Sequence, residues 1–227
     1  MKKIMFNDRY GLTQAVLEGR KTMTRRIIKG EFEKVTAYHA NGGLCFLADT
    51  KDGETIILEP QYLECENVAV AQRYKDVIRI ANSDESVWQF LVEKDLMQSG
   101  GVIDIRLCTC AGYDNKMFVV ARFMPHRIRI TNLKVERLQD ISDEDCIKEG
   151  IEYDSAEGSR LWWYDIPDCQ DVKLKNTLMR HEWYGQTGCW FWDTPQGAFS
   201  ALIDCIIGKG TWERNPWVFA YEFELIK

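Results

Sequence analysis

The sequence lacks any uncharged apolar run that approaches the roughly 18 residues of a membrane-spanning helix. After the two lysines near the N-terminus, only Ile4, Met5 and Phe6 precede the polar residue Asn7. Three apolar residues are too few for the core of a signal peptide. We therefore expect a cytoplasmic protein that does not enter a membrane.

The chain also lacks a Cys-x-x-Cys pair, although it contains eight cysteines. The closest two are Cys108 and Cys110, which together with His126 would supply only half of a zinc site at an unusual spacing. A cytoplasmic protein keeps its thiols reduced, and free cysteine behaves as a small buried apolar residue. We expect neither a metal nor a cofactor.

The chain has no excess of positive charge, because 35 acidic residues outnumber 29 basic ones and the formal net charge is -6. An acidic chain is a poor sequence-independent binder of duplex nucleic acid, which depends on neutralising phosphates. One stretch, EGRKTMTRRIIKG at residues 18–30, differs from the rest by gathering five basic residues: Arg20, Lys21, Arg25, Arg26 and Lys29. Any role in nucleic-acid binding would depend on such a local patch.

Periodicity and capping residues predict short strands with a few helices attached. Helices are expected at residues 7–19, from Ser83 onward, at 142–150 and at 194–208; strands are expected within 34–59, at 67–74, as a hairpin of 102–110 with 116–124, at 126–138 and at 216–226. This pattern is typical of an α+β domain around a small mixed sheet or barrel. We expect a single domain over residues 1–227.

Residues 151–193 differ from the rest because they show weak periodicity and a high density of aromatic side chains. The aromatics include Trp162, Trp163, Tyr164, Trp183, Tyr184, Trp190, Phe191 and Trp192. Aromatic side chains at this density are costly to leave in water, so we interpret the segment as an insertion folded onto the domain. A local core is favoured over a lid or pocket wall, and a surface that binds a protein partner is a further alternative.

Three segments carry a resemblance to a known family. LEGRKTMTRR, at residues 17–26, is similar to the signature stretch of the ASCH family within the PUA-like superfamily. Residues 121–151 and 210–224 resemble a branch of ASCH-like proteins that is common in phages and prophages. The resemblance spans nearly the whole chain and implies a PUA-like β-barrel with flanking helices around a cleft.

In the PUA-like superfamily that cleft is associated with RNA or modified nucleotides, and some small ASCH members are amidohydrolases that act on acetylated cytidine. The resemblance places Lys21 and Thr24 on the base and the nucleophile of those enzymes, a role that a desolvated lysine and an activated hydroxyl can perform. Their third residue is a glutamate, and Gln72 occupies its position here. An amide cannot accept a proton at neutral pH, which argues against hydrolysis unless Glu64 or Glu66 substitutes.

The remaining ligand-binding candidates are basic or aromatic. Arg25 and Arg26 follow one another on a strand, so at most one of them faces the cleft. Arg122 has the geometry to contact a phosphate or a base, and Tyr74 could stack on a base. The leading hypothesis is a cleft that binds RNA or a modified nucleotide or nucleoside. The alternatives are an amidohydrolase with Thr24 and Lys21 in catalysis, or a protein-interaction module that uses residues 151–193.

Overall fold

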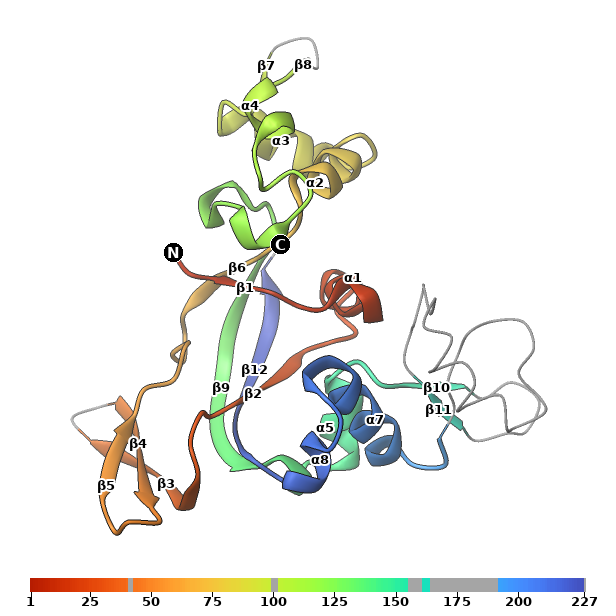
Figure 1. The fold of residues 1–227 in the computed structure, drawn as a ribbon. Helices are drawn as coiled ribbons and strands as arrows, with labels where there is room; N and C mark the ends of the chain where they lie inside the picture. The colour runs from red at the N-terminus through yellow and green to blue at the C-terminus, as the bar shows by residue number, and fades with distance from the viewer. Residues whose placement is uncertain (41–42, 99–101, 155–160, 164–191, 227) are drawn as a thin grey trace. The chain divides into compact units, whose positions relative to one another are not determined.

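The computed structural model describes residues 1–40, 43–98, 102–154, 161–163 and 192–226 (Figure 1). Contacts within the chain divide it into two compact units that alternate along the sequence. Unit 1 comprises Met1–Phe6, Cys65–Ile130 and Glu224–Lys227, and unit 2 comprises Asn7–Glu64 and Thr131–Phe223. The single domain with an inserted segment stays a prediction, because most of residues 151–193 lies outside the described part of the chain.

The largest sheet has five strands in the order β1-β6-β9-β12-β2. Their bounds are Lys3–Ile4 for β1, Met23–Ile27 for β2, Asn67–Val70 for β6, Arg127–Arg137 for β9 and Trp217–Ile226 for β12. Strand β1 runs parallel to β6, whereas β6 with β9 and β12 with β2 are antiparallel pairs. Strands β9 and β12 each contribute residues to both units.

Unit 1 adds helices and short strands to β1, β6 and the beginning of β9 (Figure 1). These elements are α2 (Tyr74–Ala81), α3 (Glu85–Glu93), β7 (Met97–Gln98), β8 (Val102–Ile103), α4 (Ile105–Thr109) and the 3-10 helices η2 (Lys116–Phe118) and η3 (Ala121–Phe123). Their core includes Val77, Leu91 and Met124, all nearly inaccessible to solvent. The helix predicted from Ser83 is confirmed, with Asp84 as its N-cap.

Two sequence predictions in unit 1 are wrong. The expected strand 67–74 ends at Val70, and Tyr74 begins helix α2 instead. The expected hairpin of 102–110 with 116–124 is replaced by α4, η2 and η3, with only residues 102–103 of that stretch in a strand. Apolar runs this short fit a strand or a buried helical turn equally well, so periodicity could not decide between them.

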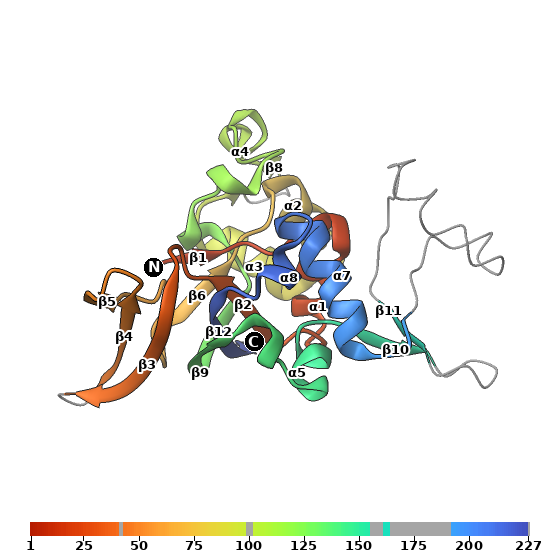
Figure 2. The ribbon, with the colours of Figure 1, turned by 60° about the horizontal axis from the view of Figure 1, so that its bottom comes forward.

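Unit 2 contains a second sheet and most of the remaining helices (Figure 2). Its elements are η1 (Asp8–Tyr10), α1 (Leu12–Leu17), β3 (Phe32–Ala40), β4 (Gly43–Thr50), β5 (Thr55–Leu58), η4 (Leu138–Asp140), α5 (Asp143–Lys148), β10 (Glu152–Asp154), β11 (Leu161–Trp163), α7 (Pro195–Ile207) and α8 (Thr211–Arg214). Strands β3, β4 and β5 form an antiparallel meander, as the turn residues predicted. Helix α7 contacts α5 and β11.

The capping predictions in unit 2 are confirmed. The side chain of Ser142 accepts a hydrogen bond from the Asp145 N–H and begins α5, and Thr194 does the same for α7 through the Gly197 N–H. The predicted helix 7–19 is divided, because Gly11 adopts a φ of 63° and separates η1 from α1. A left-handed residue ends one helical segment and allows the next to begin in a new direction.

The α+β class is thus confirmed. Over the described ranges the strands form open sheets and no closed barrel. In the same ranges no helix combines the length and apolarity that would be needed to cross a lipid bilayer.

Candidate functional site

The basic stretch after α1 leads into the interior of unit 2. Lys21 is only 2% exposed. Its Nζ donates to the Glu149 carboxylate at 2.5 Å and to the Glu149 backbone oxygen at 2.7 Å. Glu149 is the C-cap residue of α5 and is itself buried. The ammonium that the sequence suggested for a ligand is therefore paired within the protein.

Arg25 lies beside this pair and contacts three carboxylates. Its Nε and Nη2 donate to Glu136 at 2.9 and 2.6 Å, Nη2 also donates to Asp145 at 2.9 Å, and Nη1 donates to Glu149 at 3.1 Å. Lys134 adds contacts to Asp145 and Glu136 at 2.7 and 3.0 Å. We call these six residues the charge cluster: Lys21, Arg25, Lys134, Glu136, Asp145 and Glu149. Three cations balance three carboxylates, so the charge cluster is formally neutral.

The charge cluster shifts the pKa values of its members. Burial lowers the pKa of Lys21 despite the opposing attraction of Glu149. For Asp145, burial raises the pKa, but Lys134 and Arg25 outweigh it, so the net shift is downward. A carboxyl group whose pKa is lower in the folded protein than in the unfolded chain stabilises the fold at pH values above its unfolded pKa. This stabilisation is lost as the pH falls through the pKa of the folded state. The contribution of Asp145 to the charge cluster is therefore present at neutral pH and is lost on acidification.

Thr24 and Arg26 lie on the other face of β2. Side chains alternate along a strand, and the 3.2 Å contact of Arg25 Nη1 with Met23 Sδ places these two residues on one face. Thr24 and Arg26 are cross-strand neighbours of Tyr221 and Phe219, on the alternate face. Thr24 is 5% exposed. The structure thus does not bring the Thr24 hydroxyl to the face on which Arg25 and Lys21 contact Glu149.

The other three predicted site residues lie in unit 1, near residues 120–126. Gln72 Oε1 is 2.7 Å from His126 Nδ1, and the Tyr74 hydroxyl accepts a hydrogen bond from the Val120 N–H at 2.9 Å. Burial raises the pKa of Tyr74, and the nearby Arg122 opposes this shift. Gln72, Tyr74 and Arg122 thus form one neighbourhood, whereas Lys21, Thr24, Arg25 and Arg26 belong to unit 2.

Two further arginines of unit 1 were missed by sequence reasoning. Arg127 and Arg129 alternate on β9 with the fully buried Ile128 and Ile130 and so share the opposite face. Arg127 Nε is buried and makes no hydrogen bond within the described residues. In the same part of the chain, no carboxylate pairs with Arg122, Arg127 or Arg129. The alternation of arginine with isoleucine was the available signal.

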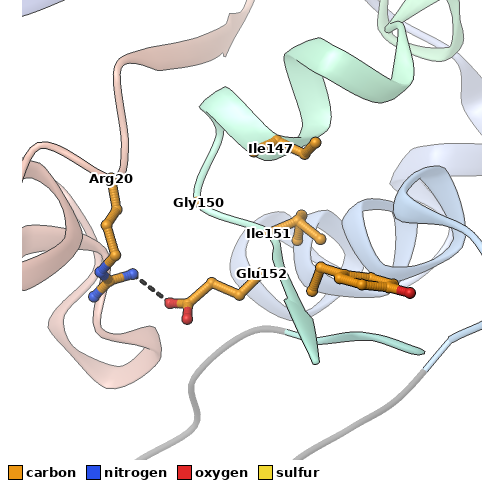
Figure 3. Close-up of a pocket in the computed structure, with 6 residues that line it drawn as sticks. Arg20, Ile147, Gly150, Ile151 and Glu152 are labelled. Atoms are coloured by element: carbon orange, nitrogen blue, oxygen red, sulfur yellow. Dashed lines mark hydrogen bonds and ion pairs between the residues drawn. The ribbon is translucent and has the colours of Figure 1, made fainter. Parts of the chain in front are cut away.

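A hollow of about 490 Å³ lies at the surface of unit 2 (Figure 3). It is lined by Arg20, Ile147, Gly150, Ile151, Glu152 and Tyr153. Arg20 donates to Glu152 across one side and also to Glu18, so its charge is already balanced. Gly150, with a φ of 100°, would place an added Cβ 3.7 Å from Lys21 Cβ. Gly150 therefore separates the hollow from the side chain of Lys21, and Arg20, the one cation that lines the hollow, is paired.

No group of three or more His, Cys, Asp and Glu side chains in the described ranges is arranged to hold a metal ion. Comparison with family models, curated proteins and solved structures finds no match to this chain.

Burial of α5 should be detectable at Cys146, which is fully buried beside the charge cluster. Burial raises the pKa of this thiol to about 12. Since the thiolate is the reactive form, we expect alkylation of Cys146 in the native protein at pH 8 to be at least about 100-fold slower than that of the exposed Cys65. Peptide mass spectrometry after timed labelling measures both rates. Equal rates would mean that the face of α5 that carries Cys146 is not buried.

Proposed function

We propose that the protein binds RNA and that Arg122, Arg127 and Arg129 of unit 1 contact its phosphates. The observation that carries this proposal is the absence of carboxylate partners for these three arginines in the described residues, together with the buried, unbonded Arg127 Nε. Arg122 and Arg129 are exposed, so a phosphate can reach their guanidinium groups. Guanidinium groups suit phosphate geometry.

The distribution of charge supports this location. Unit 1 contains twelve Lys and Arg residues against nine Asp and Glu residues, a net charge of +3, whereas unit 2 contains 17 against 26, a net charge of -9. Residues 115–130 contain four basic and no acidic side chains. In contrast, the basic stretch at 18–30 contributes Lys21 and Arg25 to a neutral cluster. The phosphate contacts thus belong to unit 1.

The resemblance to the ASCH family is consistent with this function. Its second segment, residues 121–151, contains all three arginines. On this basis we also propose a PUA-like relationship for the mixed α+β fold. Gln72 and Tyr74 adjoin Arg122, and a modified nucleoside is an alternative ligand for the same neighbourhood.

Fluorescence anisotropy with a labelled 12-nucleotide RNA tests the proposal. We expect Arg127→Ala with Arg129→Ala to weaken binding about 10- to 100-fold and to reduce the salt slope by about 1.4, because two single-strand phosphate contacts are lost. The matched control is Lys29→Ala with Lys51→Ala, two exposed lysines of unit 2, for which we expect less than a 2-fold effect. Lack of binding at low salt, or equal affinity of both double variants, would refute the proposal.

The amidohydrolase remains a second candidate because of one observation. The carboxylate beside Lys21 is Glu149, so an acidic partner exists although Gln72 replaces the expected glutamate. The separation of Thr24 onto the other face of β2 speaks against a direct proton transfer from its hydroxyl to Lys21. Incubation with acetylated cytidine decides the matter: release of cytidine that disappears in both Thr24→Ala and Lys21→Ala would support hydrolysis, and no release would reject it.

A further inference from the structure

Unit 1 presents exposed apolar side chains a few residues before Arg122. Met117, Phe118 and Val120 are 58%, 57% and 43% exposed. Phe118 is the one exposed aromatic side chain among them, and it lies four residues before Arg122. Contiguous exposed apolar side chains commonly mark a surface that binds a partner or ligand.

The backbone that carries Phe118 is held on both sides. The Met117 N–H donates to the Asn115 side chain at 2.9 Å, which begins η2. Lys3 Nζ donates to the backbone oxygens of Met117 at 2.6 Å and Val119 at 2.7 Å. The exposed ring therefore projects from an anchored turn, and little order must be created when a ligand binds.

We infer that Phe118 is a stacking platform for an unpaired base, so that the RNA bound by unit 1 is single-stranded. This inference rests on the proposed RNA binding. A phenyl ring stacks on any base whose face is free, whereas the bases of a duplex already stack on each other. Arg122, which lies in the same neighbourhood as Val120 and Tyr74, would hold a flanking phosphate. The charged side chains of residues 115–130 are all basic. A polyanion such as RNA therefore complements this segment better than a protein surface with few acidic residues would.

Binding of single-stranded and duplex RNA of equal length, measured by anisotropy, tests the inference. We expect Phe118→Ala to weaken single-strand binding about 5- to 150-fold and to change duplex binding less than 2-fold. Phe118→Tyr should retain the affinity, because it keeps an aromatic face. Met117→Ala is the matched control, since it removes an equally exposed apolar side chain without a ring, and we expect less than a 3-fold effect.

The outcomes separate the two proposals. If the Arg127 and Arg129 variant loses affinity but Phe118→Ala does not, the stacking role is overturned and RNA binding stands. If no RNA binds to the wild-type protein, the proposed function itself fails. Sedimentation analysis adds a further discriminator: self-association of the wild type that is lost in Phe118→Ala would identify the patch as a protein interface and overturn the stacking role.

Discussion

Replacing Glu149 by alanine should lower the free energy of unfolding by about 3–5 kcal/mol. The substitution removes the carboxylate that contacts both Lys21 and Arg25, whose side chains are 2% and 1% exposed. Breaking a buried ion pair on one side leaves a charge that neither water nor a partner stabilises. Denaturation by urea, followed by tryptophan fluorescence, measures the change.

Glu152→Ala provides the matched control. Glu152 pairs with Arg20, but these side chains are 29% and 38% exposed, so solvent already screens the interaction. Exposed pairs of this kind contribute about 0–1 kcal/mol, and we expect a loss within that range. A gain in stability for Glu149→Ala would contradict the structural role. It would indicate instead that Lys21 and Glu149 are held together at a cost to the fold, as in a catalytic site.

Elements with local signals could be predicted from the sequence. Helix α5 begins after a Ser142 cap and α7 after Thr194 with Pro195, and both positions depend only on residues within one turn. The meander of β3, β4 and β5 follows from turn residues such as Gly53, whose φ is 80°. In each case the sequence that determines the structure lies within a few residues of it.

Residues 102–124 could not be predicted in this way. Their elements are β8, α4, η2 and η3, each of five residues or fewer, and such short segments lack a full period of apolar residues. Long-range contacts define them instead, such as Lys3 Nζ with Val119 and Tyr74 with Val120. Tertiary contacts of this kind have no local signature.

The candidate site shows the same limit for charged residues. The basic stretch at 18–30 was recognisable, but the partner of Lys21 is 128 positions away in sequence. Counting positive charges cannot reveal which of them are neutralised by a distant carboxylate. The converse holds for Arg127 and Arg129: the role that we propose for them depends on the absence of carboxylate partners within the described residues, which the sequence alone does not reveal.

Arg25→Lys should destabilise the protein by about 2–4 kcal/mol even though it keeps the charge. The guanidinium donates from three nitrogens to Glu136, Asp145 and Glu149, and a single ammonium on a shorter side chain cannot reach all of them. Each buried carboxylate left without its donor loses a charged hydrogen bond. Arg20→Lys is the control, because water can take over the hydrogen bonds that the exposed guanidinium makes with Glu18 and Glu152. We expect this substitution to lower the free energy of unfolding by about 0–1 kcal/mol.

A double-mutant cycle of Arg25→Lys with Glu136→Gln separates direct pairing from general loss of structure. Glu136 receives two of the hydrogen bonds of Arg25, at 2.9 and 2.6 Å, so the effects of the two substitutions should not add. We expect a coupling free energy of about 0.5–3 kcal/mol, the range observed for residues in one ion-pair network. Additive effects would show that Arg25 does not depend on Glu136.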